Sequence, residues 1–303
     1  SPTVYDLAAY PKTLSGKTVA AYVNAHTDLS DDLYRDGKLV SDNYKNILRA
    51  QTNASAIPAE VTVRYGVTVR RTNIRNLPTG EGLFFYASDR NFDALQETAL
   101  DPGEAVAILH TSTNGYFYYV QAYNYRGWLS KFDVAETDRS TWLRYAEPKN
   151  FLTVVAKDYT LKADGAQVLF QQGARLQLAD KKASAYTVKV PVRTKEGKLQ
   201  EEKVVLAANA SLHEGYLPYT TNNIIRSAFK FYDSVYGWGG LQQSVDCSSF
   251  ISNAYRTVGI FLPRNADEQE TSAGIHKKMG NMSSAQRANV IKSLTPGSTL
   301  HMD

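Results

Sequence analysis

The hydrophobic pattern of this chain changes twice along its length, and that change limits the folds it can adopt. Residues 61–72 (VTVRYGVTVRRT) alternate β-branched and polar residues, as a strand with one solvated face does. Short strand patterns then continue to about residue 207. Before and after this region, apolar residues recur at helical spacing, for example in residues 44–52 (YKNILRAQT). The pattern predicts a multidomain α+β chain with a β-rich centre.

The β-rich centre divides into two blocks. The first contains strand patterns at residues 104–111, 116–123 and 126–130, separated by Gly, Pro and Asn turn signals. The second begins near Phe151 and includes the hairpin signals ADGA at Ala163 and KEGK at Lys195. Short strands at such spacing predict two small barrels in succession.

Length and composition restrict the class of protein further. A chain of 303 residues with 43% hydrophobic and 21% charged residues is typical of a globular protein with two to four compact units. It contains no apolar run of the ~18 residues that cross a membrane. The net charge of +4 comes without basic runs, which argues against a nucleic-acid partner. The first residues carry no export-signal pattern, so we expect any such signal to be absent from this chain.

Cys247 is the only cysteine, and it precedes a predicted helix. Apolar residues at Phe250, Ile251 and Ala254 predict that a buried stripe follows it. Unpaired backbone N–H groups and the helix dipole favour a negative charge at a helix N-terminus, which suits a thiolate nucleophile. The backbone N–H of Cys247 is also placed to stabilise an oxyanion.

The surroundings of this cysteine decide between two interpretations. In one, Cys247 is a small buried hydrophobe that packs beneath the helix with Phe250. In the other it is a nucleophile, because the polar residues Asp246, Ser248 and Ser249 make a poor core environment. The Gly239–Gly240 pair ahead of it would leave room for an extended substrate chain.

Four motifs in order resemble the NlpC-type cell-wall cysteine peptidases: YGWGG from Tyr236, DCSSF from Asp246, LPRNADEQ from Leu262 and TPGSTLHM from Thr295. The upstream stretch from Val63 to Glu81 is similar to the same group. The resemblance covers essentially the whole chain. It implies a helical N-terminal segment over residues 1–62, SH3-like barrels over 63–148 and 149–210, and a papain-like α+β peptidase domain over 211–303.

The resemblance also implies an activity. The enzymes of the family that the chain resembles are the γ-D-glutamyl-L-diamino-acid endopeptidases. They hydrolyse murein peptides between D-Glu and the diamino acid and prefer a free N-terminal L-Ala. The implied partner is a murein peptide, and the implied location is the cell envelope, either periplasmic or extracellular and including a lipoprotein form. Thiolate acyl transfer needs no cofactor and no metal.

Site residues follow from the resemblance by position. Cys247 is the implied nucleophile. The implied substrate ligands are Glu81 and Tyr125 for the free amine, with Tyr123 as the neighbouring alternative. Tyr236, Asp246 and Ser248 are implied for the D-Glu portion, and Arg264 matches the substrate-binding arginine that follows the helix in the family. The chain departs from the family at Asn265 and Ala266, where related sequences carry an acidic residue. This difference removes one charge from the predicted amine site.

The catalytic histidine of the family falls just after the PGSTLHM strand. We therefore expect the chain to end at Asp303 just before its general base, with His301 as the rival candidate. An alternative function follows, in which the chain is a catalytically incomplete wall-binding protein that uses its barrels. A third is a related amidase or acyltransferase with the same cysteine chemistry.

Overall fold

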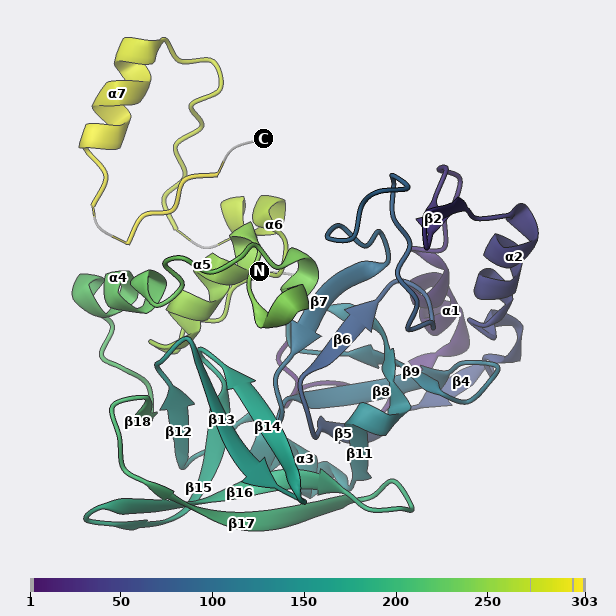
Figure 1. Ribbon diagram of the computed structural model, residues 1–303, viewed down its shortest axis with the longest axis horizontal. Helices are drawn as coiled ribbons and strands as arrows, with labels where there is room; N and C mark the ends of the chain where they lie inside the picture. Colours follow the sequence, from purple (N-terminus) through teal and green to yellow (C-terminus); the bar gives the residue numbers. More distant parts are fainter. Residues whose placement is uncertain (1–2, 273, 296, 302–303) are drawn as a thin grey trace.

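The computed structural model of the chain describes residues 3–272, 274–295 and 297–301. In Figure 1 the N-terminal part and the first β block lie to the right, the second β block lies below, and the C-terminal helices lie above it. The three parts meet around one helix, α5 (Cys247–Arg256). Its position is therefore the feature of the fold that bears most on function.

The N-terminal part mixes helices with short strands, which corrects the prediction of a helical segment. Its elements are β1 (Thr13–Ser15), α1 (Gly16–Asn24), β2 (Tyr34–Arg35), β3 (Lys38–Leu39), α2 (Asp42–Ala50), the 3₁₀ turn η1 (Ala54–Ala56) and β4 (Glu60–Thr62). Ser15 and Ser41 cap the two helices by accepting hydrogen bonds from Thr18 N and Tyr44 N. Strands form as well because β1 pairs with β4, and β2 with β3.

The first β block is a seven-stranded antiparallel sheet in the order β11-β5-β8-β9-β10-β6-β7. Its elements are β5 (Arg64–Thr68), β6 (Thr72–Arg75), β7 (Gln96–Leu100), β8 (Ala105–Thr111), β9 (Phe117–Gln121), β10 (Arg126–Ser130), η2 (Lys131–Asp133), β11 (Val134–Thr137) and α3 (Arg139–Ala146). Strand β8 is buried on both faces. Ala105 and Ala107 join one hydrophobic cluster with Trp142 of α3, while Val106 and Ile108 join another.

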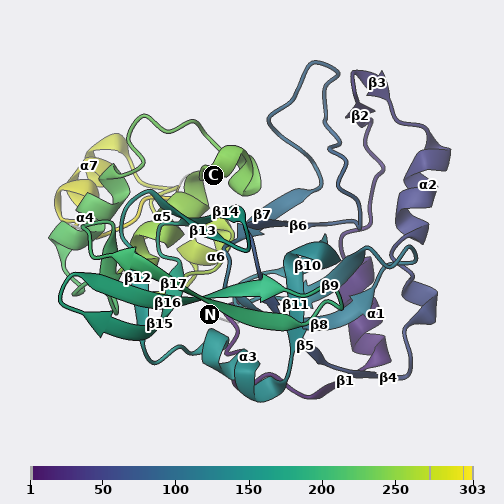
Figure 2. The same ribbon diagram turned by 60° about the horizontal axis from the view of Figure 1, so that its bottom comes forward.

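The second β block contains a five-stranded sheet in the order β17-β16-β15-β12-β18 and a separate hairpin, β13-β14. Its strands are β12 (Phe151–Val154), β13 (Asp158–Ala163), β14 (Ala166–Gln171), β15 (Arg175–Lys182), β16 (Ala185–Arg193), β17 (Leu199–Ala207) and β18 (Leu212–Glu214). The predicted ADGA turn joins β13 to β14, with Asp164 and Gly165 both at positive φ. Figure 2 shows β16 and β17 as a long hairpin that extends toward the first block.

Helices dominate the C-terminal part. They are α4 (Thr221–Phe229), the 3₁₀ segment η3 (Trp238–Gln243), α5 (Cys247–Arg256), α6 (Ala266–Glu270) and α7 (Ser284–Lys292). The aromatic residues Phe229, at the end of α4, and Tyr232, just after it, are 68% and 74% exposed. Over the described residues, no helix has both the length and the apolar character to cross a bilayer.

The buried surface of α5 is wider than the stripe predicted from its sequence. Ala254 of that stripe is 2% exposed, and Phe250 and Ile251 are partly buried. The polar residues Ser252, Asn253 and Arg256 are also at most 6% exposed, because this side of the helix lies against both β blocks. The apolar stripe therefore identified only part of the contact surface of this helix.

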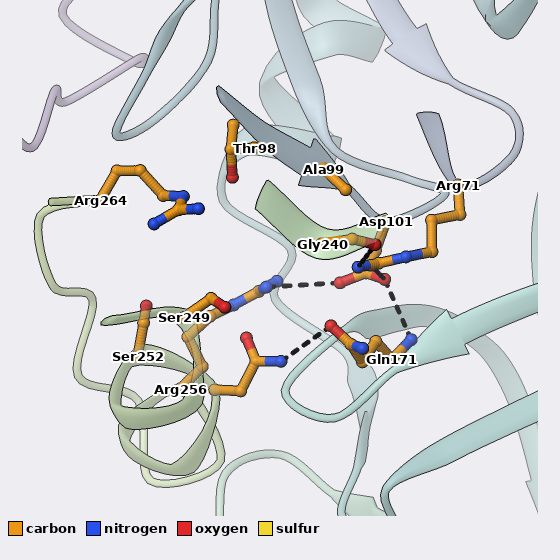
Figure 3. A pocket seen from close by; sticks show the side chains of 11 residues that line it. Arg71, Thr98, Ala99, Asp101, Gln171, Gly240, Ser249, Ser252, Arg256 and Arg264 are labelled. Carbon is orange, nitrogen blue, oxygen red and sulfur yellow. Dashed lines mark hydrogen bonds and ion pairs between the residues drawn. The ribbon is translucent and has the colours of Figure 1, made fainter. Parts of the chain in front are cut away.

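A buried ionic junction joins the end of α5 to the first β block. Arg256 donates to Glu104 Oε1 at 2.5 Å and to Asp101 Oδ2 at 3.4 Å. Asp101 also accepts from Arg71 at 3.0 Å. Figure 3 shows Arg71, Asp101 and Arg256 around a small polar cavity, together with Gln171 of the second block. Each buried charge has an opposite charge within contact distance, as burial of charge requires.

The turn after β14 forms a wedge between the helices of the C-terminal part. Gln171 accepts a hydrogen bond from Asn253 of α5 at 2.9 Å, and Gln172 donates to Ser227 O of α4 at 2.9 Å. Gly173 follows with a φ of +83°, and a Cβ there would lie 2.6 Å from the Cβ of Arg256. This position therefore requires glycine. The second β block contacts α4 and α5 through this turn.

Replacing Arg256 tests the ionic junction. Arg256→Ala leaves Glu104 buried without its cation, so we expect the free energy of unfolding to fall by about 3 kcal/mol. Arg226→Ala on the exposed side of α4 is the matched control and should change it by no more than about 0.5 kcal/mol. Chemical denaturation measures both. A loss below about 1 kcal/mol for Arg256→Ala would contradict the structural role given to this pair.

Candidate active site

The chain positions Cys247 as the first residue of α5. Asp246 is the N-cap: its side chain accepts a hydrogen bond from Ser249 N at 3.0 Å. In return the Ser249 hydroxyl accepts from Asp246 N at 2.9 Å, which completes a capping box. The thiol is exposed, so the interpretation of Cys247 as a buried hydrophobe is wrong.

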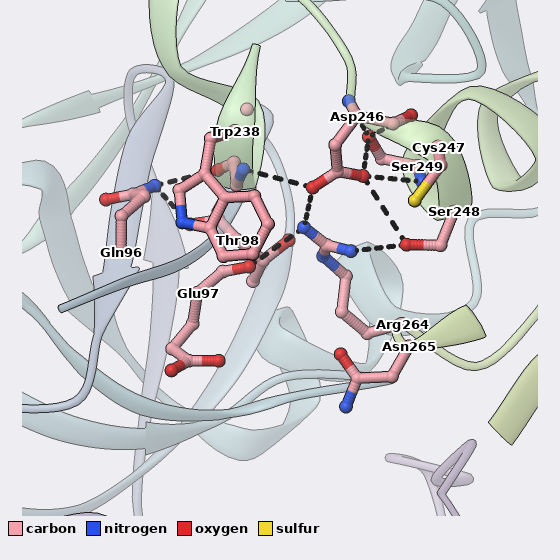
Figure 4. A network of polar contacts seen from close by, with 12 residues as sticks. Gln96, Glu97, Thr98, Trp238, Asp246, Cys247, Ser248, Ser249, Arg264 and Asn265 are labelled. Carbon is pink, nitrogen blue, oxygen red and sulfur yellow. Dashed lines mark hydrogen bonds and ion pairs between the residues drawn. The ribbon is translucent and has the colours of Figure 1, made fainter. Parts of the chain in front are cut away.

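Asp246, Ser248 and Arg264 form one buried network behind the thiol (Figure 4). Arg264 donates to Asp246 Oδ2 at 2.5 Å and to Ser248 Oγ at 2.7 Å. It also donates to Glu97 O of β7 at 2.9 Å. The network therefore ties the start of α5 to the first β block.

Two opposing effects set the charge of Asp246. Burial alone would raise the pKa of its carboxyl, but Arg264 and the Ser249 hydrogen bonds hold that pKa below its ordinary value. Asp246 is therefore a carboxylate, and its negative charge is compensated within the protein by Arg264.

The glycines before the thiol have a different use from the one predicted. Gly239 and Gly240 adopt φ values of +56° and +83° and are buried against β7. A Cβ on Gly239 would lie 2.6 Å from Gln96 Cγ, and one on Gly240 would lie 2.7 Å from Ala99 Cβ. The space that these glycines provide is thus occupied by the first β block, and it is not available to a substrate.

Tyr236 contacts the sulfur directly. Its hydroxyl donates to Cys247 Sγ at 3.9 Å, a distance typical of a weak hydrogen bond to sulfur. Burial and the interaction with Cys247 raise the pKa of Tyr236 to about 12, so it is a neutral donor at physiological pH. Tyr236 and Cys247 also line a cavity of about 250 Å³ with the apolar residues Phe231, Val235, Val245 and Phe250.

The structure does not bring the two predicted amine ligands together. Glu81 pairs with Arg35 at 2.7 Å and accepts a hydrogen bond from Tyr44, both in the N-terminal part. Tyr125 instead donates to the carboxylate of Glu97 on β7. Sequence reasoning missed Glu97, although the alternation of QETAL points it away from the buried face of the strand.

The positions of the histidines determine whether the described residues supply a general base for the thiol. The structure describes all five histidines, and none of them is within hydrogen-bonding distance of the Cys247 sulfur. His301, the rival base, contacts Thr299 Oγ1 at 3.0 Å. His276 contacts Ser272 O at 2.8 Å. In the described part of the chain, the side chain that contacts the thiol is therefore Tyr236.

Comparison with known families finds two matching segments. Residues 233–298 match the NlpC/P60 family, and residues 83–130 match the SH3 domain of SH3b1 type. The exposed Cys247 at the start of α5 lies inside the NlpC/P60 segment.

Solved structures with the same fold include two bacterial proteins. An NlpC/P60 endopeptidase from Photobacterium damselae subsp. piscicida has a TM-score of 0.74 and 21% identity, covering 95% of this chain and 63% of that one. An NlpC/P60 family protein from Bacillus cereus ATCC 10987 has a TM-score of 0.53 and 14% identity, covering 71% and 79%. This chain thus spans 63% of the length of the Photobacterium protein. No curated protein matches its sequence.

Replacing the N-cap carboxylate by its amide tests the network behind the thiol. Asp246→Asn keeps an oxygen that can cap α5 but removes the charge beside Arg264, so we expect a loss of about 3 kcal/mol in unfolding free energy near pH 7. Because the pKa of Asp246 is lowered in the folded state, the stability advantage of the wild type over Asp246→Asn is fully present above the ordinary carboxyl pKa of 3.8. It disappears as the pH falls through the lower folded-state pKa.

Denaturation curves at neutral and acidic pH measure this difference. Asp267→Asn, at an exposed site on α6, is the matched control and should have little effect at either pH. A stability gap for Asp246→Asn that stays constant on acidification would rule out the ionic role of Asp246.

Proposed function

We propose that this chain is the main part of a γ-D-glutamyl-L-diamino-acid endopeptidase that hydrolyses murein peptides in the cell envelope. The observation that carries the proposal is the exposed Cys247 sulfur at the N-terminus of α5, beside an open cavity. The NlpC/P60 match and the SH3 domain support the choice of a cell-wall substrate.

The reaction is acyl transfer through the thiol. The Cys247 thiolate attacks the γ-carbonyl carbon of D-Glu, and a sulfur–carbon bond forms. The tetrahedral intermediate then expels the amine of the diamino acid, which leaves with a proton, and the thioester remains. Water hydrolyses the thioester and restores the thiol. The Cys247 backbone N–H and the Tyr236 hydroxyl are donors close enough to the sulfur to stabilise the developing oxyanion.

This proposal assigns the general base to the histidine that the NlpC-type family places after the motif PGSTLHM. In the family that base takes the proton of the thiol and returns it to the leaving amine. The proposed reaction is therefore tested on the protein as its gene encodes it.

Recognition of a free N-terminal amine is assigned in this proposal to Glu97 with Tyr125. The carboxylate of Glu81 is already compensated by Arg35, while Glu97 has no ion-pair partner among the described residues. Burial and the nearby Glu97 carboxylate raise the pKa of Tyr125, so its phenol stays neutral and donates to Glu97. The Glu97 carboxylate is thus available to bind a substrate ammonium group. It would also replace the charge that Asn265 lacks.

Removing the sulfur tests the reaction itself. In the full-length protein, Cys247→Ala should abolish hydrolysis of L-Ala-γ-D-Glu-diaminopimelate, measured by separation of the dipeptide product. Cell-wall binding by the same variant should be unchanged. Equal hydrolysis by wild type and variant would refute the proposal, while binding without hydrolysis in both would favour a wall-binding protein.

Replacing each acidic candidate by glutamine tests which of them, Glu97 or Glu81, binds the substrate amine. Glu97→Gln should lower kcat/KM for the free tripeptide by about tenfold to a hundredfold, the loss expected for a charge-assisted hydrogen bond. It should leave the slow hydrolysis of the N-acetylated tripeptide unchanged. Glu81→Gln is the matched control, with little effect on either substrate. A larger effect for Glu81→Gln would return the role to Glu81.

A further inference from the structure

Phe92 belongs to the first β block, yet its ring contacts two aromatic side chains beside the thiol. It lies in the loop between β6 and β7, over residues 76–95. Its ring centroid is 6.1 Å from that of Tyr236 and 5.7 Å from that of Trp238. Both distances fall in the range of attractive aromatic pairs. A loop of one domain therefore packs on the wall of the site in another.

The base of this loop is fixed by buried contacts. Asp93, next to Phe92, is 4% exposed and pairs with Arg75 at 2.7 Å. Its carboxylate also accepts hydrogen bonds from the backbone N–H groups of Leu83 and Leu95, at 3.1 and 3.0 Å. The backbone oxygen of Asp93 accepts from Trp238 Nε1 at 3.1 Å. The β block thus determines where the Phe92 ring lies.

The ring of Tyr236 needs such a support. Its backbone is held by a bridge to Val245, which fixes the Cα position but leaves the side-chain rotamer free. The residue is 48% exposed, so few core contacts restrict the ring. Phe92 is the aromatic ring that packs against it among the described residues.

We propose that Phe92 is a positioning residue, which holds the Tyr236 ring so that its hydroxyl donates to the Cys247 sulfur. This inference rests on the proposed role of Cys247 as the nucleophile. A hydrogen bond to the thiolate increases the ionised fraction near neutral pH and lowers the intrinsic nucleophilicity of the sulfur. At pH values where the thiol is only partly ionised, the gain in ionised fraction exceeds the loss of nucleophilicity. Where the thiol is fully ionised, only the loss of nucleophilicity remains.

Alkylation of the single cysteine by iodoacetamide measures this effect without any peptide substrate. The sulfur–carbon bond forms as iodide leaves, so the rate reports the reactivity of Cys247 alone. We expect Phe92→Ala to slow alkylation about threefold near pH 7 and to make it faster than wild type where the thiol is fully ionised. Tyr236 stays neutral through that range because its pKa is about 12. Tyr236→Phe should give the same crossing of the two pH profiles.

Three further variants make the test specific. Phe85→Ala is the matched control, since Phe85 lies in the same loop and is equally exposed at 46%. It should leave the profile unchanged, and Phe92→Tyr should restore it. The double variant Phe92→Ala/Tyr236→Phe should be no slower than either single variant. A wild-type profile for Phe92→Ala, or effects that multiply in the double variant, would overturn the inference.

The result of the alkylation test can be distinguished from the result of the hydrolysis test of the proposed function. Loss of murein hydrolysis in every form of the protein, together with crossing alkylation profiles, would reject the peptidase and leave the role of Phe92 intact. Normal hydrolysis together with a wild-type alkylation profile for Phe92→Ala would support the peptidase and overturn the role of Phe92.

Discussion

The place of the thiol depends on a buried guanidinium at the far end of its helix. Arg256 closes α5 and pairs with Asp101 and Glu104 of the first β block. At the other end, Arg264 joins the N-cap of α5 to the backbone of the same block. Since removing one partner of a buried pair is strongly unfavourable, α5 can neither slide nor rotate without exposing or isolating a charge. The helix that carries Cys247 is therefore held at both ends.

The interface around α5 is polar, and this has a consequence for the geometry of the site. Hydrogen bonds and ion pairs have preferred directions, while apolar contacts are tolerant of small displacements. Gly239 and Gly240 let β7 approach closely, so the first β block forms a side wall of the site. Through Phe92 it also reaches the aromatic ring that contacts the sulfur. The geometry around the Cys247 thiol is thus set by the first β block as well as by the C-terminal part.

The sequence predicted the local features well. Alternation and turn signals predicted strands in both β blocks, the ADGA signal predicted a hairpin, and the apolar residues after Cys247 predicted helix α5. Contacts between distant segments could not be predicted from the sequence. The apolar stripe of α5 identified only part of its buried surface, because Arg256 finds its partners some 150 positions earlier. The pairing of Glu97 with Tyr125 was missed for the same reason, since alternation assigns a face but not a partner.

The wedge formed by Gln171, Gln172 and Gly173 also bears on how such proteins evolve. A domain joined only by a linker can be exchanged by recombination and still fold beside a new neighbour. Here the turn after β14 fits between α4 and α5, and a single added methyl group at Gly173 would collide with Arg256. A replacement barrel would need the same turn with the same glycine. We therefore expect the second β block and the helices α4 and α5 to be inherited together, as one unit of descent.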